Sequence, residues 1–118
     1  MTLAAVPVMT ISMSEERRGL RFPFDATAEV FRENSPEGVP ARVKELSLRG
    51  CFLETSAPPA AQLLRVKIFH AGEHFEASAE VIYTRPSGLG VVFGDMNPHF
   101  RALLQKWILA VLDDRVEK

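Results

Sequence analysis

The stretch LRVKIFHAGEHFEASAEVIYTRPSGLGVVF, residues 64–93, decides the fold because side-chain polarity alternates along most of it. Such alternation is typical of a strand with one buried face. Ala71-Gly72 and Pro86-Ser87-Gly88 are turn sequences. The stretch therefore predicts three antiparallel strands. The apolar face of the middle strand is expected to carry Phe75, Ala77, Ala79, Val81 and Tyr83 together.

The same period continues toward the N-terminus. Residues 24–31 alternate, with Ala26, Ala28 and Val30 on one face, and residues 41–44 alternate after the turn at 34–38. Residues 47–50 read as a connection, and Cys51–Glu54 as a short strand. Six short strands with turns between them predict a mainly β domain, a six-stranded antiparallel β-barrel, because closure removes exposed strand edges.

The C-terminal segment changes to a helical period. Asn97 suits a helix N-cap and Pro98 suits the first helical position. The sequence therefore predicts a C-terminal amphipathic helix that covers the open end of the barrel, with Trp107 in the core. Its apolar face comprises Phe100, Leu103, Leu104, Trp107, Ile108, Val111 and Leu112.

Size and composition limit the classes of function. The 118 residues suit one domain, taken as 14–118, with 1–13 as a flexible N-terminal extension. The net charge of −1 and the scarcity of aromatics next to the arginines disfavour nucleic-acid binding. One cysteine fits a reducing cytoplasm, and no apolar run approaches the ~20 residues that insert into a membrane.

Two short clusters carry candidate binding residues. Arg17, Arg18 and Arg21 stand within five residues, and guanidinium forks match phosphate oxygens and the O6 and N7 acceptors of guanine. The alternative is a solvated patch paired with Glu15 and Glu16.

In the second cluster, Glu45-Leu46-Ser47-Leu48-Arg49-Gly50, the carboxylate of Glu45 can accept from a guanine edge and Ser47 can donate or accept. Gly50 is expected to permit a positive φ and close approach of a ligand. The alternative is a turn stabilised by its own polar side chains.

Together the clusters resemble the PilZ domain family, whose pattern is Arg-x-x-x-Arg followed by Asp/Asn-x-Ser-x-x-Gly. Gly50–Glu54 and Gly88–Phe93 are similar to the family as well, so the resemblance covers residues 15–112. It implies a receptor for cyclic di-GMP that acts through an effector protein and is not an enzyme. It also implies that Arg17 and Arg21 are the main ligand residues, that Arg18 adds a contact, and that Ser47 and Gly50 line the opposite wall. The 14–22 segment is expected to close over the ligand.

Glu45 departs from the family pattern, where Asp or Asn stands. Its longer side chain leaves two roles open: contact with a guanine edge, or an ion pair with an arginine that competes with the ligand. The second role favours another hypothesis, a PilZ interaction module for a motility or pilus protein that binds no nucleotide.

The remaining candidate residues predict no catalytic or metal site. His70, His74 and His99 are expected on the surface without a metal, and Cys51 is expected to be a buried structural thiol. The Trp107 helix is a candidate surface for a homodimer.

Overall fold

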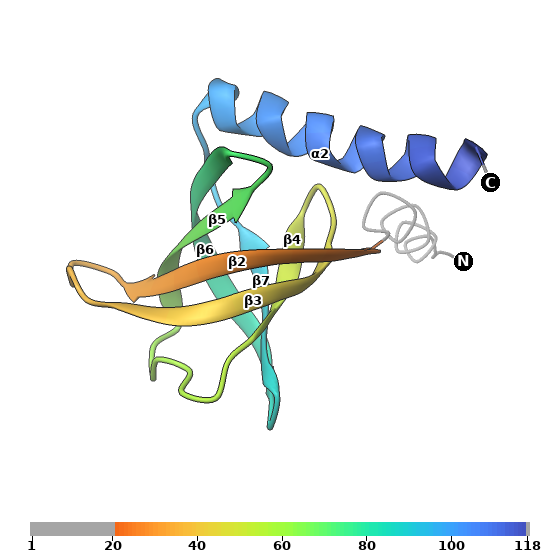
Figure 1. The fold of residues 1–118 in the computed structure, drawn as a ribbon. Coiled ribbons are helices and arrows are strands. Elements are labelled where there is room, and N and C mark those ends of the chain that lie inside the picture. Colours follow the sequence, from red (N-terminus) through yellow and green to blue (C-terminus); the bar gives the residue numbers. More distant parts are fainter. Residues whose placement is uncertain (1–20, 118) are drawn as a thin grey trace, which may run out of the picture.

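The computed structural model describes residues 21–117 and contains a closed antiparallel barrel followed by a helix (Figure 1). The order around the barrel is β2-β3-β4-β7-β6-β5, and every neighbouring pair is antiparallel. The predicted six-stranded barrel with a C-terminal helix is thus confirmed. The elements are β2 (Phe22–Arg32), β3 (Gly38–Leu46), β4 (Gly50–Glu54), β5 (Leu63–His70), β6 (Glu73–Arg85), β7 (Gly88–Phe93) and α2 (Pro98–Glu117).

Period-two alternation places the apolar side chains inside the barrel, as the sequence predicts. Ala26, Ala28 and Val30 of β2 are buried, while the residues between them are exposed. β5 and β6 show the same pattern, and their inward side chains join one core cluster. The tight β5–β6 turn is made by Ala71 and Gly72, whose φ angles are 53° and 78°.

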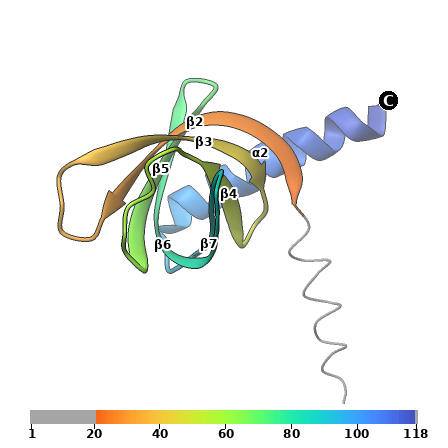
Figure 2. The same cartoon turned by 90° about the horizontal axis from the view of Figure 1, so that it is seen from below.

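Helix α2 lies across one end of the barrel (Figure 2). Its first turn is capped as expected, because Asn97 Oδ1 accepts a hydrogen bond of 2.8 Å from the amide of His99. The buried face of α2 comprises Leu103, Leu104, Trp107 and Ile108.

Trp107 anchors α2 to the barrel. Its ring lies 5.8 Å from the ring of Phe24 in β2 and 6.3 Å from that of Phe75 in β6. His70 is partly buried, with its ring 4.5 Å from Phe24 and 5.3 Å from Trp107, so the expectation of a surface position was wrong for this histidine. His74 and His99 are exposed, as predicted.

Within residues 21–117, no helix is both long and apolar enough to cross a membrane. No group of three or more His, Cys, Asp or Glu side chains in the same part of the chain is placed to hold a metal ion.

Candidate functional site

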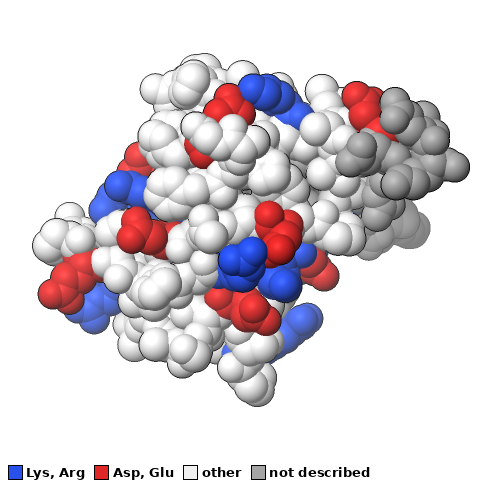
Figure 3. Space-filling view, viewed as in Figure 1, with Lys and Arg blue, Asp and Glu red and all other residues white. Residues whose placement is uncertain are grey.

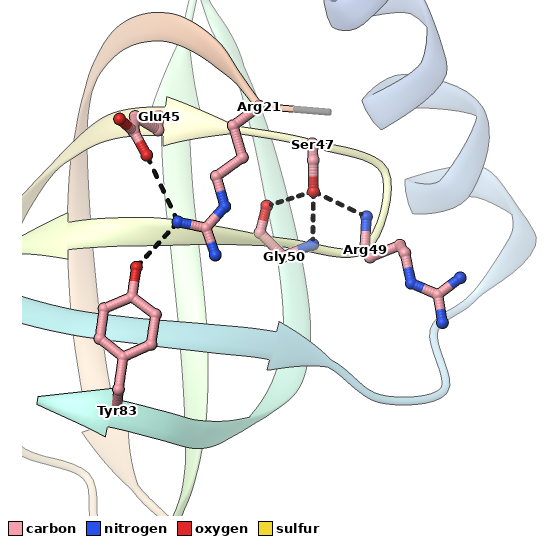
Figure 4. Close-up of polar contacts among 6 residues, drawn as sticks. All are labelled: Arg21, Glu45, Ser47, Arg49, Gly50 and Tyr83. Carbon is pink, nitrogen blue, oxygen red and sulfur yellow. Dashed lines mark hydrogen bonds and ion pairs between the residues drawn. The ribbon is translucent and has the colours of Figure 1, made fainter. Parts of the chain in front are cut away.

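The site forms where the start of β2 meets the end of β3. Phe22 pairs with Leu46 in the sheet, so Arg21, which precedes β2, lies beside the Ser47–Gly50 turn (Figure 4). Two residues that are 26 positions apart in sequence, Arg21 and Ser47, are thereby neighbours at one corner of the barrel.

The Arg21 guanidinium has two oxygen partners. Its Nη1 donates to the Tyr83 hydroxyl oxygen at 2.8 Å and to Glu45 Oε1 at 3.4 Å (Figure 4). The guanidinium carbon also lies 5.7 Å from the centre of the Tyr83 ring. The hydrogen bond to Tyr83 is the main cause that raises the pKa of Arg21, with a smaller contribution from Glu45. The cation is therefore held in a defined place and remains charged.

Glu45 reaches Arg21 because both strands are irregular at this point. The β3–β4 register shifts between Val43 and Glu45, and the β2–β3 register shifts between Pro23 and Ala26. Bulges of this kind re-aim side chains next to functional sites. The Glu45 side chain is 50% exposed and that of Arg21 34% exposed, so the pair faces solvent.

Ser47 is buried and uses its hydroxyl within the turn. Its Oγ donates to the carbonyl of Gly50 at 3.2 Å and accepts from the amides of Arg49 and Gly50, both at 3.1 Å (Figure 4). One donor and two acceptor lone pairs are thus all occupied. Ser47 shapes the turn, which is the second of the two roles that the sequence leaves open; direct contact with a ligand stays a prediction.

Gly50 is required by the barrel itself. Its φ is not positive, so the expectation of a left-handed backbone was wrong. A Cβ at Gly50 would lie 2.0 Å from the carbonyl oxygen of Val91 in β7. Glycine is needed because β4 and β7 approach closely here, and no side chain would fit between them.

Sequence reasoning missed Tyr83 as a site residue. It was expected on the inner face of β6, but the register shifts between Val81 and Tyr83, and the ring turns outward over Gly90. An isolated glycine within a strand, opposite an aromatic, is the signal that marks such a position. The prediction placed Tyr83 on the inner face because it assumed strict alternation along β6. The extra residue between Val81 and Tyr83 breaks that alternation.

Tyr83, which is partly buried, belongs to a group of rings and cations in which Phe52 is buried and Arg85 is exposed. Its ring is stacked beside Phe52 of β4 at 6.3 Å, with 19° between the planes. The guanidinium of Arg85 lies over both rings, 4.8 Å from the Tyr83 centroid and 5.5 Å from that of Phe52. Arg21 and Arg85 thus flank one aromatic ring beside the Ser47–Gly50 turn. Flat aromatic and guanidinium faces of this kind stack on nucleobases.

The other candidate residues predicted from the sequence fall outside this group. Arg17 and Arg18, like the expected extension at 1–13, lie outside the described residues. Cys51 is fully buried, and burial raises the pKa of its thiol to about 12, so it is protonated at neutral pH and is not a nucleophile. Cys51 is thus the buried thiol that the sequence predicts.

Solved structures with the same fold are known. The PilZ domain of CeSA from a cellulose-synthesizing bacterium has a TM-score of 0.64 and 16% identity, over 76% of this chain and 95% of that chain. YcgR from Escherichia coli, solved in complex with c-di-GMP, has a TM-score of 0.67 and 17% identity, over 86% of this chain and 48% of that chain. The Bacillus subtilis inhibitor of motility, MotI/DgrA, has a TM-score of 0.64 and 14% identity, over 86% of this chain and 52% of that chain.

These similarities concern the fold, and the chain spans only about half the length of the last two proteins. A search of curated proteins found no match. The family comparison is more direct, because the model of the PilZ domain matches residues 15–110, most of the sequence. The chain therefore belongs to the PilZ domain family.

Proposed function

We propose that this PilZ domain is a receptor for cyclic di-GMP that passes the signal to an effector protein by direct contact and catalyses no reaction. Membership of the family supports this function. So does the similarity in fold to YcgR, whose structure was solved with c-di-GMP. The free, buried Cys51 thiol supports a cytoplasmic location, where thiols stay reduced.

The observation that carries the proposal is the meeting of Arg21 with the Ser47–Gly50 turn. A guanidinium there can pair with a phosphate or with the O6 and N7 atoms of guanine. Tyr83 and Arg85 add a flat, cationic surface for a base. The corner thus offers both kinds of contact that a cyclic dinucleotide requires, charge pairing and stacking.

The proposal gives the remaining motif residues specific roles. Arg17 and Arg18 come from the segment before β2, and we assign them to the phosphates and bases as Arg21's partners. Ser47 and Gly50 keep the turn in the shape that a ligand would meet. A ligand held by Arg17 and Arg18 together with Arg21 would change the surface offered to the effector.

The direct test is titration calorimetry with cyclic di-GMP, using cyclic di-AMP and GTP as controls. Arg21→Ala is expected to weaken binding by about 10-fold or more, because a charge-assisted hydrogen bond is lost. Arg65→Ala is the matched control. It removes the same charge from β5, where Arg65 lies 4.9 Å from the ring of Phe31 and 3.8 Å from Glu76. Equal affinity for wild type and Arg21→Ala would refute the assignment.

A second candidate function is an interaction module that binds no nucleotide and docks a motility or pilus protein. The contact of Glu45 with Arg21 favours this function, because the carboxylate already pairs with the guanidinium that a nucleotide would need. The similarity in fold to the inhibitor of motility is consistent with it. The absence of heat with cyclic di-GMP at about 100 μM would select this function over the receptor.

Nucleic-acid binding has less support. On the face shown in Figure 3, Lys and Arg side chains lie beside Asp and Glu rather than in a patch of one sign. Arg42, for example, makes a two-pronged ion pair with Asp25 at 2.8 and 3.1 Å. Proteins that track a phosphate backbone are expected to gather positive charge along one face.

A further inference from the structure

The contact between Arg21 and Glu45 has a consequence for how the site responds to its ligand. Arg21 Nη1 is 2.8 Å from the Tyr83 hydroxyl but 3.4 Å from Glu45 Oε1. The shorter bond to a neutral group holds the guanidinium in place. The longer contact to the carboxylate therefore adds negative charge to the site without being needed to position the arginine.

Backbone geometry keeps this carboxylate at the site. Glu45 pairs with Phe52 across β3–β4 and with Pro23 across β2–β3, next to a register shift in each ladder. Its Cα is thus fixed on two sides, and only the side chain can move away from Arg21. At 50% exposure the side chain has room in solvent to do so.

A dianionic ligand that pairs with Arg21 also meets the charge of Glu45, which lies 3.4 Å from Arg21 Nη1. The ligand must displace the carboxylate and remain close to it afterwards, because the backbone of Glu45 does not move. Both effects lower the affinity, the first by the loss of an ion pair and the second by repulsion between like charges.

We propose that Glu45 is an internal competitor, a carboxylate that occupies the anion position at Arg21 and sets the ligand concentration at which the site fills. For cyclic di-GMP this inference rests on the function proposed above. It assigns Glu45 a role opposite to that of a ligand residue. Tyr83 is the positioning residue that keeps Arg21 at the site when Glu45 is displaced.

Glu45→Gln tests the competitor, because it keeps the length and the acceptor oxygen of the side chain and removes the charge. Calorimetry is expected to show cyclic di-GMP bound roughly 3- to 10-fold more tightly than by wild type. Glu29→Gln is the control. It removes the same charge from an exposed position farther along β2, opposite Pro40 and Lys67, and is expected to leave affinity unchanged. If wild type binds cyclic di-GMP, equal or weaker binding by Glu45→Gln would overturn the inference.

A second measurement separates this inference from the identity of the ligand. Inorganic pyrophosphate is titrated into both proteins while the Arg21 Nε–H signal is followed by NMR. Tighter pyrophosphate binding by Glu45→Gln supports the competitor even if neither protein binds cyclic di-GMP, in which case only the proposed ligand fails. Equal pyrophosphate affinity in the two proteins contradicts the competitor even if both bind cyclic di-GMP.

Discussion

Single residues in the second motif serve the barrel at least as much as a ligand. The Ser47 hydroxyl is fully used inside the turn, and Gly50 is needed because Val91 of β7 lies against it. A serine and a glycine at this spacing thus predict a turn of defined shape. The side chains around the turn that remain for ligand contact are Arg21, Glu45, Tyr83 and Arg85.

The next residue, Cys51, gives a prediction about pH. Burial raises the pKa of its thiol from 9.0 to about 12. The unfolded chain therefore loses this proton at a lower pH than the folded chain does. The stability that the protonated thiol contributes is complete below pH 9.0 and is lost as pH rises toward about 12.

Urea unfolding of wild type and Cys51→Ala as a function of pH measures this effect. The difference in unfolding free energy between the two proteins is expected to be constant below pH 9.0. Above pH 9.0 the unfolding free energy of wild type is expected to fall relative to that of Cys51→Ala. Iodoacetamide at pH 8 is expected to modify Cys51 only in urea. Rapid modification of the native protein would show that the thiol is accessible and the argument wrong.

At the scale of elements, the attachment of α2 depends on apolar burial rather than on charge. Trp107 is 3% exposed and packs on rings from β2 and β6. The ion pair between Lys106 and Glu73 is short, at 2.8 Å, but both side chains face solvent. Exposed pairs contribute little, so the indole is the anchor.

Trp107→Ala is therefore expected to destabilise the domain by about 3–5 kcal/mol, because a large buried ring is replaced by a cavity. Leu109→Ala is the control on the same helix, since Leu109 is 59% exposed, and is expected to change stability by less than about 0.5 kcal/mol. Chemical denaturation followed by circular dichroism measures both variants. Similar losses in the two would mean that α2 does not dock through Trp107.

For the whole molecule, closure of the barrel depends on the contact between β4 and β7. Five residue pairs join these strands, from Gly50–Val92 to Glu54–Gly88. The glycines at the two ends each lie against the opposite backbone, since a Cβ at either would be 2.0 Å from a carbonyl oxygen. Because neither backbone can move without opening the barrel, these positions do not tolerate a side chain.

Gly50→Ala is expected to lower stability by at least about 2 kcal/mol and to speed amide exchange in β4 and β7. Gly72→Ala provides the comparison. Gly72 has a φ of 78° but nothing within 4 Å of its Cβ position, so only the cost of a left-handed residue applies, about 1–2 kcal/mol. A Gly50→Ala protein as stable as wild type would leave ligand contact as the reason for glycine there.

Most of the fold could be read from local patterns, and the assembly of the site could not. Alternation in β5 and β6, and the Asn97-Pro98 start of α2, depend on neighbours within a few residues, so the strands and helix were predictable. The face of Tyr83 depends on an extra residue in β6, seen only once that strand pairs with β7. The contact of Arg21 with Glu45 joins residues 24 apart, and the need for glycine at position 50 comes from Val91. These features arise when distant strands are brought into register, and no periodicity within one segment encodes that register.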